Sequence, residues 1–179
     1  MTFSRYQVQK GFTLIELLVV IAIIAALAVL ITTAVQSARN KAYTARALKE
    51  FRVFGDAMIL YLIDNDTYPD DVNRDIPSGL EQYLSNRGEW PNGPYPGSVY
   101  DWDNIASPSQ APTDPYIQIS LRFCDINGNN CYFPIESWAV DFDRYSSMYW
   151  CFEGPCRSHA NQPIDHPGYC VNCDISQEV

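Results

Sequence analysis

The chain has 179 residues, of which 47% are hydrophobic and 18% charged, and its formal net charge is −9. This composition excludes a disordered tail and a charge-rich coiled coil. Residues 1–52 carry a net charge of +5, whereas residues 53–179 carry −14; the acidic second part argues against a nucleic-acid-binding module, because a phosphate backbone repels it.

An apolar run of 24 residues occupies positions 12–35 and contains one charged residue, Glu16. As a helix it would be about 36 Å long, enough to cross the hydrocarbon core of a bilayer. Arg5 and Lys10 precede it without an acidic residue, so the positive-inside rule places residues 1–11 in the cytoplasm and the rest outside the cytoplasmic membrane. Five cationic residues between positions 39 and 52 weaken that asymmetry.

Other interpretations of the apolar run stay open. An uncleaved signal anchor has the same composition, and a core helix of a small body is disfavoured by the length of the run. Ala26-Leu27-Ala28 also fits the small-x-small pattern of a secretory cleavage site, which would give a mature start near Val29.

Glu16 distinguishes these interpretations. A carboxylate inside an apolar span costs about 2–3 kcal/mol or more and usually faces a partner. No Lys, Arg or His lies within the span, so we expect that partner to come from elsewhere. A cut after Gly11 would create a positive amine on Phe12, four residues from Glu16, which could neutralise the carboxylate of a neighbouring chain.

The segment Lys10-Gly11-Phe12-Thr13-Leu14-Ile15-Glu16 resembles the class III signal of type IV prepilins and type II secretion pseudopilins. The resemblance continues to residue 31, and residues 61–69 are similar to the helix end of major pseudopilins. It implies cleavage by prepilin peptidase between Gly11 and Phe12, N-methylation of Phe12 and Glu16 as the assembly carboxylate. Ala25 and Thr33 depart from the family, where glycine and proline are common.

The resemblance also implies a function and a location. The chain would be a structural subunit of a pilus-like fibre or a secretion pseudopilus, without catalytic residues. Its partners would be identical or related subunits, the prepilin peptidase, and an assembly platform with its ATPase. It would cross the bacterial cytoplasmic membrane once, with its head outside, before entering the fibre.

The apolar run continues into an amphipathic helix. An apolar stripe at steps of three and four predicts one buried face, formed by Ala47, Phe51, Phe54, Met58 and Tyr61. Turn-forming residues after Ile63, followed by Pro69, end the helix. We therefore expect four parts: a cleaved leader at 1–11, a transmembrane half-helix at 12–35, an amphipathic half at 36–63 and a head at 64–179.

The head is predicted to be a small antiparallel sheet packed on that stripe, which makes the fold α+β and pilin-like. Residues 70–115 are rich in turn formers and predict loops with one short helix at 78–84. Residues 116–123 alternate apolar and polar side chains, as in a half-buried strand. Asn127-Gly128 predicts a type I′ turn, with a return at 132–135 and a further strand at 136–142.

Six cysteines lie at or beyond position 124 and are expected to tie the head and its tail covalently. The hairpin register places Cys124 opposite Cys131, close enough for a disulfide. Disulfides among Cys151, Cys156, Cys170 and Cys173 are favoured outside the cytoplasm, without a defined pairing. The spacing also permits a zinc site with His159 and His166 as spare ligands, or a redox pair at Cys170 and Cys173.

No cofactor is predicted. Asp125-x-Asn127-x-Asn129 has the spacing of the start of a calcium loop, but a hairpin turn explains it better. Asp141 and Asp143 could bind calcium or be solvated. No phosphate-binding loop, nucleophile elbow or zinc-protease motif is present. The alternative function is an uncleaved, membrane-anchored zinc, redox or binding domain.

Overall fold

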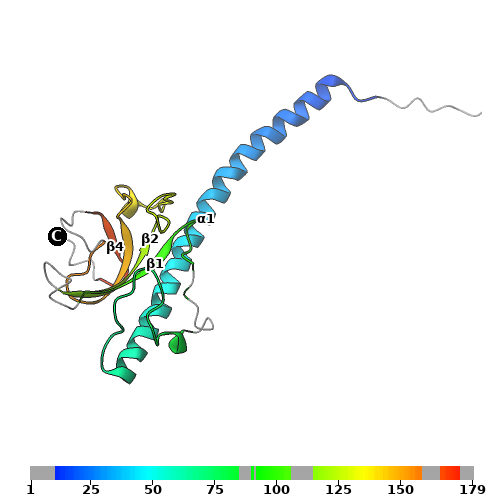
Figure 1. The fold of residues 1–179 in the computed structure, drawn as a ribbon. Helices are drawn as coiled ribbons and strands as arrows, with labels where there is room; N and C mark the ends of the chain where they lie inside the picture. The colour runs from blue at the N-terminus through cyan, green and yellow to red at the C-terminus, as the bar shows by residue number, and fades with distance from the viewer. Residues whose placement is uncertain (1–10, 85–89, 91, 106–114, 159–165, 174–179) are drawn as a thin grey trace, which may run out of the picture. The chain divides into compact units, whose positions relative to one another are not determined.

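The computed structural model describes residues 11–84, 90, 92–105, 115–158 and 166–173. The chain forms two compact units, residues 1–39 and residues 40–179. Within the described residues the elements, labelled where possible in Figure 1, are a helix, two 3₁₀ turns and four strands: α1 (Leu14–Asn65), η1 (Glu81–Tyr83), β1 (Val99–Ile105), β2 (Tyr116–Arg122), η2 (Ser137–Ala139), β3 (Ser147–Glu153) and β4 (Gly168–Cys170). The leader residues 1–10 and His159 lie outside the described residues.

Helix α1 has 52 residues and agrees with the predicted long helix to within two residues at each end. It ends where Asp66 takes a left-handed conformation at φ 58° and donates its N–H to the Leu62 carbonyl at 2.9 Å. Because such a residue closes the last helical turn, the chain turns away here. The turn residues after Ile63 therefore stop the helix as expected.

The predicted apolar stripe of α1 is the centre of the core in the second unit. Ala47, Phe51 and Met58 are fully buried and Phe54 is 2% exposed. The Phe51 and Phe54 rings both contact Tyr100 of β1 edge-to-face, at 5.6 and 4.7 Å between centroids. Figure 1 shows the sheet beside this part of the helix. The helix-on-sheet arrangement is confirmed.

The sheet has the strand order β1-β2-β3-β4. The pairs β1–β2 and β2–β3 are antiparallel, but β3–β4 is parallel, so the sheet is mixed and not antiparallel throughout. Strand β2 confirms the strand predicted at 116–123. Strand β1 lies within residues that the sequence assigned to loops, and β3 and β4 were also not predicted.

Strand β2 is buried on both faces, although its alternation predicts one core face. Its polar side chains Gln118 and Ser120 are fully buried and Arg122 is 6% exposed. The segment after β3 covers this polar face: Arg157 N–H donates to Gln118 Oε1 at 2.9 Å, and Gln118 Nε2 donates to the Arg157 carbonyl at 2.8 Å. Because the buried Gln118 amide is hydrogen-bonded in this way, the polar face of β2 can be covered by the segment after β3.

The turn after β2 differs from the predicted type I′ turn. Gly128 N–H donates to the Asp125 carbonyl at 2.8 Å, and Asp125 N–H donates to the Asn129 carbonyl at 2.9 Å. Gly128 has a φ of 73°, which glycine adopts without strain. The loop therefore has three residues, a type I turn followed by a left-handed glycine. Asp125 pairs with Asn129 across this loop, so the return segment is displaced by one residue from the pairing that a two-residue turn would give.

The strands predicted at 132–135 and 136–142 are absent. The second segment contains η2 and successive turns, in which Ala139 N–H donates to the Glu136 carbonyl at 3.0 Å and Phe142 N–H to the Ala139 carbonyl at 3.2 Å. Trp138 stacks on Tyr169 at 4.4 Å between centroids, so aromatic packing holds these turns in place of a strand ladder. The short helix predicted at 78–84 is reduced to η1.

Candidate functional site

Gly11 and Phe12 lie directly before the first turn of α1. Neither belongs to a regular element, and the Phe12 side chain is 80% exposed. The peptide bond between them is therefore outside the hydrogen-bond ladder of the helix.

Thr13 and Glu16 form a reciprocal cap at the start of α1. Thr13 N–H and Oγ1 donate to Glu16 Oε2 at 2.8 and 2.7 Å, and Glu16 N–H donates to Thr13 Oγ1 at 3.3 Å. This is a capping box, which satisfies backbone donors that the helix cannot pair. The partner of Glu16 was expected outside the chain, whereas Thr13 of the same chain bonds it; the Thr-x-x-Glu spacing in the sequence is the signal of this cap.

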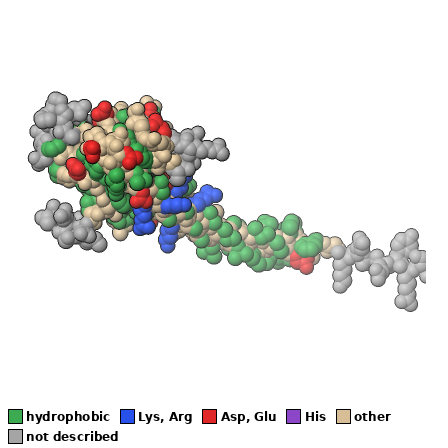
Figure 2. Space-filling model, turned by 90° about the horizontal axis from the view of Figure 1, so that it is seen from below, with side chains coloured by type: hydrophobic (Ala, Val, Ile, Leu, Met, Phe, Trp, Pro, Cys, Tyr) green, Lys and Arg blue, Asp and Glu red, His purple; other side chains and the backbone are tan. Residues whose placement is uncertain are grey.

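The first half of α1 is apolar on all sides. Large side chains from Leu14 to Ile31 are about half exposed or more, and no residue of the most apolar 18-residue window is buried. Hydrophobic side chains cover this stretch in Figure 2. Among the described residues, this helix is long and apolar enough to span a membrane. A surface of this kind requires lipid or neighbouring helices around it.

Cationic side chains follow the apolar stretch on α1. Arg46 Nε pairs with Glu50 at 2.7 Å, and its Nη2 donates to the Asn92 carbonyl at 3.0 Å. Lys49 and Arg52 are exposed. These three residues lie 11 to 17 positions after Val35, about 16–26 Å along the helix, and therefore beyond the headgroup level of a bilayer spanned by residues 12–35.

All six cysteines form disulfides between neighbours in the sequence. The bonds join Cys124 to Cys131, Cys151 to Cys156, and Cys170 to Cys173. The sequence left the pairing of the last four open. Because each of those sulfurs is bonded to another, none is a thiolate ligand for zinc in this structure.

Comparisons with known proteins agree with the geometry of the helix start. Residues 7–32 match the family described as "Prokaryotic N-terminal methylation motif", a range that contains Gly11, Phe12 and Glu16. The chain is 31% identical over 109 residues to type II secretion system core protein G of Pseudomonas aeruginosa, covering 60% of this chain and 68% of that protein. It is 35% identical over 112 residues to core protein G of Klebsiella michiganensis, covering 63% and 71%.

The chain belongs to the type II secretion pseudopilin family. A further relative is core protein G of Escherichia coli, which is 38% identical over 73 residues, or 41% of this chain and half of that protein. No solved structure matches this pseudopilin.

In this pseudopilin, the Asp125 carboxylate accepts hydrogen bonds within the turn after β2. Its Oδ1 accepts the N–H groups of Asn127 and Asn129, each at 2.9 Å, and its Oδ2 accepts Asn130 Nδ2 at 2.8 Å. The hydrogen bond from the Asn129 backbone, with the others, lowers the pKa of Asp125. The Asp-x-Asn-x-Asn pattern is therefore a turn motif in this structure.

Asp143 is also occupied by the pseudopilin's own groups. It accepts Tyr145 N–H at 2.8 Å and Ser146 N–H at 3.0 Å, and it pairs with His166 Nδ1 at 2.8 Å. Partial burial raises the pKa of Asp143, but the hydrogen bonds from His166 and the turn outweigh this, and the net shift is downward. Asp141 is exposed. Within the described residues, no three His, Cys, Asp or Glu side chains are placed to hold a metal ion.

Proposed function

We propose that this pseudopilin is a structural subunit of a type II secretion pseudopilus that is cut by prepilin peptidase between Gly11 and Phe12 and then polymerises through α1. One observation carries the proposal. The Gly11–Phe12 bond lies outside the helix, and the helix that follows it is apolar on every side except at Glu16.

Cleavage changes the charge at the start of the helix. Hydrolysis leaves a carboxylate on Gly11 and an amine on Phe12, which is protonated at neutral pH and receives the methyl group. The mature helix then carries one cation and one anion within its first turn. In a low-dielectric surrounding, each charge requires a partner, and the amine of one subunit can neutralise Glu16 of the next.

The capping box keeps Glu16 in place until that partner arrives. Two Thr13 donors bond one carboxylate oxygen, Oε2, so Glu16 does not lie unpaired in the span. The other oxygen, Oε1, accepts no hydrogen bond among the described residues and can accept from a neighbour's amine. Assembly then adds a charge-assisted bond without breaking the cap.

The apolar surface of α1 supports a role in both membrane and fibre. Before assembly, lipid covers residues 12–35, with the head outside the cytoplasm, where the three disulfides are stable. After extraction by the assembly platform and its ATPase, neighbouring helices replace the lipid. Ala25 favours helix and Thr33 does not break one, so this span stays continuous where the family's glycine and proline would weaken it.

The proposal is tested by fibre formation in cells that carry the type II secretion machinery and overproduce the chain. Glu16→Ala is expected to be cleaved after Gly11 but absent from the sheared surface fraction. Asp56→Ala is a matched control, because Asp56 is an exposed carboxylate of the same helix outside the apolar stretch. Normal fibres from Glu16→Ala, or equal loss in both variants, contradict the role of Glu16.

A further inference from the structure

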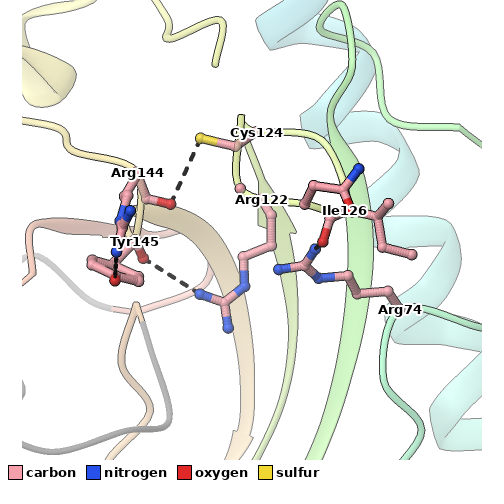
Figure 3. Close-up of a pocket in the computed structure, with 8 residues that line it drawn as sticks. Arg74, Arg122, Cys124, Ile126, Arg144 and Tyr145 are labelled. Carbon is pink, nitrogen blue, oxygen red and sulfur yellow. Dashed lines mark hydrogen bonds between the residues drawn. The ribbon is translucent and has the colours of Figure 1, made fainter. Parts of the chain in front are cut away.

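A pocket of about 290 Å³ lies between the turn after β2 and the segment that leads into β3. Its walls include three arginines, Arg74, Arg122 and Arg144, together with Ile126, Gly128 and Tyr145. In Figure 3, Arg122 lies between Arg74 on one side and Arg144 with Tyr145 on the other. The pocket belongs wholly to the second unit and is remote in sequence from the helix start.

The concentration of positive charge here is unusual for this chain. Residues 53–179 contain five Lys or Arg and nineteen Asp or Glu, and three of those five cations line this one pocket. In an acidic body, each arginine has many carboxylates available. Of the three arginines that line the pocket, Arg122 lies 3.5 Å from Asp101, whereas Arg74 and Arg144 form no ion pair with the described residues.

The two inner arginines retain unused donors. Arg122 Nη1 donates to the carbonyls of Tyr145 and Ser158, at 3.3 and 2.8 Å, and Arg74 Nη1 donates to the Ile126 carbonyl at 2.5 Å. The buried Nε of Arg74 has no hydrogen-bond partner within the described part of the chain, and the Nε of Arg122 has only the long contact with Asp101 Oδ2, at 3.5 Å. Since a buried unpaired donor is costly, a ligand oxygen that accepts from these groups would be stabilised.

The carboxylates of Asp101 and Asp125, near the pocket, already accept hydrogen bonds from other groups of the chain. Asp101 Oδ1 accepts Arg74 N–H at 2.8 Å, and both oxygens of Asp125 are used in the turn. Arg122 also interacts electrostatically with Asp103, so three guanidinium groups face three carboxylates around this pocket. Because the pocket has no large excess of positive charge, a singly charged anion suits it better than a doubly charged phosphate.

We propose that this arginine pocket binds one carboxylate group. The guanidinium groups of Arg74 and Arg122 would hold its two oxygens, and Arg144 would contribute charge at the mouth. The volume is at the lower limit for small-molecule sites, so it suits a small carboxylic acid or one carboxylate of a protein chain. This site is independent of fibre assembly through α1.

The test uses the full chain in detergent micelles, with the arginine Nε–H signals followed by nuclear magnetic resonance. Sodium acetate is added against sodium chloride at constant ionic strength. Saturable shifts of the Arg74 and Arg122 signals in acetate alone are expected. Shifts that grow linearly and equally in both salts overturn the site.

Substitutions separate a specific site from general charge. Arg144→Gln is the main variant, because Arg144 is exposed and its loss spares the buried network around Arg122. It is expected to weaken acetate binding about two- to fivefold, as for an exposed charge pair. Arg52→Gln removes an exposed cation from α1 as a control and should leave binding unchanged. Equal effects of the two variants contradict the proposal.

Different probes show whether the carboxylate comes from a protein chain or from a small acid. A short peptide with a free C-terminal carboxylate is compared with its amidated form and with acetate. Binding of the free peptide at least tenfold tighter than acetate identifies a protein carboxylate as the ligand. Equal binding of peptide and acetate identifies a free acid, and binding of the amidated peptide as tight as the free one overturns the site.

Discussion

Thr13 and Glu16 hold each other at the first turn of α1, with Thr13 Oγ1 donating to Glu16 Oε2 at 2.7 Å. This places a hydroxyl and a carboxylate together at the edge of an apolar span. The same carboxylate that is proposed to meet a neighbour's amine therefore also caps the start of its own helix. The geometry of Glu16 is set within the subunit before any neighbour arrives.

Thr13→Ala tests this coupling. The substitution removes the hydroxyl donor but keeps the backbone N–H, which still reaches Glu16 at 2.8 Å. Loss of such a cap costs about 1 kcal/mol, so we expect a reduced yield of fibres and not a complete block. Immunoblots of the sheared fraction give the yield. Thr13→Ser retains the hydroxyl and should restore it; equal defects in both variants contradict the cap.

Gly55 tests the contact between α1 and β3. A Cβ at this position would lie 3.2 Å from Cε2 and Cζ2 of Trp150. Gly55→Ala gains about 1 kcal/mol of helix propensity but crowds the ring, so we expect a net loss of about 1 kcal/mol in unfolding free energy. Denaturant unfolding measures it.

A second background makes the Gly55 prediction sharper. Trp150→Phe removes the atoms that crowd a Cβ at position 55. In that background, Gly55→Ala should become stabilising by about 0.5–1 kcal/mol, because only the propensity term remains. The same sign in both backgrounds would show that Trp150 does not set the requirement for glycine.

Asp103 makes the stability of the head depend on pH. Burial, with the charge of Asp101, raises its pKa to about 6, although Arg122 and Gln118 oppose the shift. The pKa of Asp103 is higher in the folded chain than the unfolded value of 3.8, so the fold is more stable when Asp103 is protonated. This stabilisation is complete below about pH 4 and is lost as the pH rises through about 6.

Asp103→Asn should remove this loss. An amide oxygen at position 103 can still accept from Gln118 Nε2, which donates to Asp103 Oδ2 at 2.9 Å. We expect the unfolding free energy of the variant to exceed that of the parent chain by about 2 kcal/mol at pH 7.5 and to equal it at pH 4, as measured by urea unfolding. Asp141→Asn changes an exposed carboxylate and serves as the control. A constant difference between Asp103→Asn and the parent chain at both pH values contradicts the account.

The disulfide between Cys124 and Cys131 closes the loop after β2. Its removal by Cys124→Ser with Cys131→Ser should lower the unfolding free energy by about 2 kcal/mol, because the unfolded chain gains entropy. The pair Cys170 and Cys173 closes a shorter loop, and its loss should cost about 0.7 kcal/mol less. Greater loss from the shorter loop contradicts this ranking.

The sequence predicted the features that have a clear period. The stripe from Ala47 to Met58 and strand β2 follow helix and strand periods, and both are found. Strand β1 also alternates, with Tyr100 and Trp102 inside, but the alternating Asp101 and Asp103 resemble loop residues. Both aspartates are buried in the structure, where partners such as Arg122 and Gln118 make that tolerable. Such partners come from distant segments and leave no local signal.

The short or irregular elements had no readable period. Strand β4 has three residues and pairs in parallel with β3, and the paired residues, such as Ser147 and Gly168, are 21 positions apart in the sequence. The apolar residues of 136–142 alternate, yet Val140 is 78% exposed, because turns replace the strand. The arginine pocket was also not predicted, since Arg74, Arg122 and Arg144 are brought together only by the fold.

The most direct test of the central claim is the intact mass of the mature protein from membranes, measured without reducing agent and sequenced by tandem mass spectrometry. We predict a chain that begins at N-methylated Phe12 and is lighter by two hydrogens for each of the three disulfides. A chain that retains residues 1–11, or one that begins near Val29, would contradict processing as a pseudopilin.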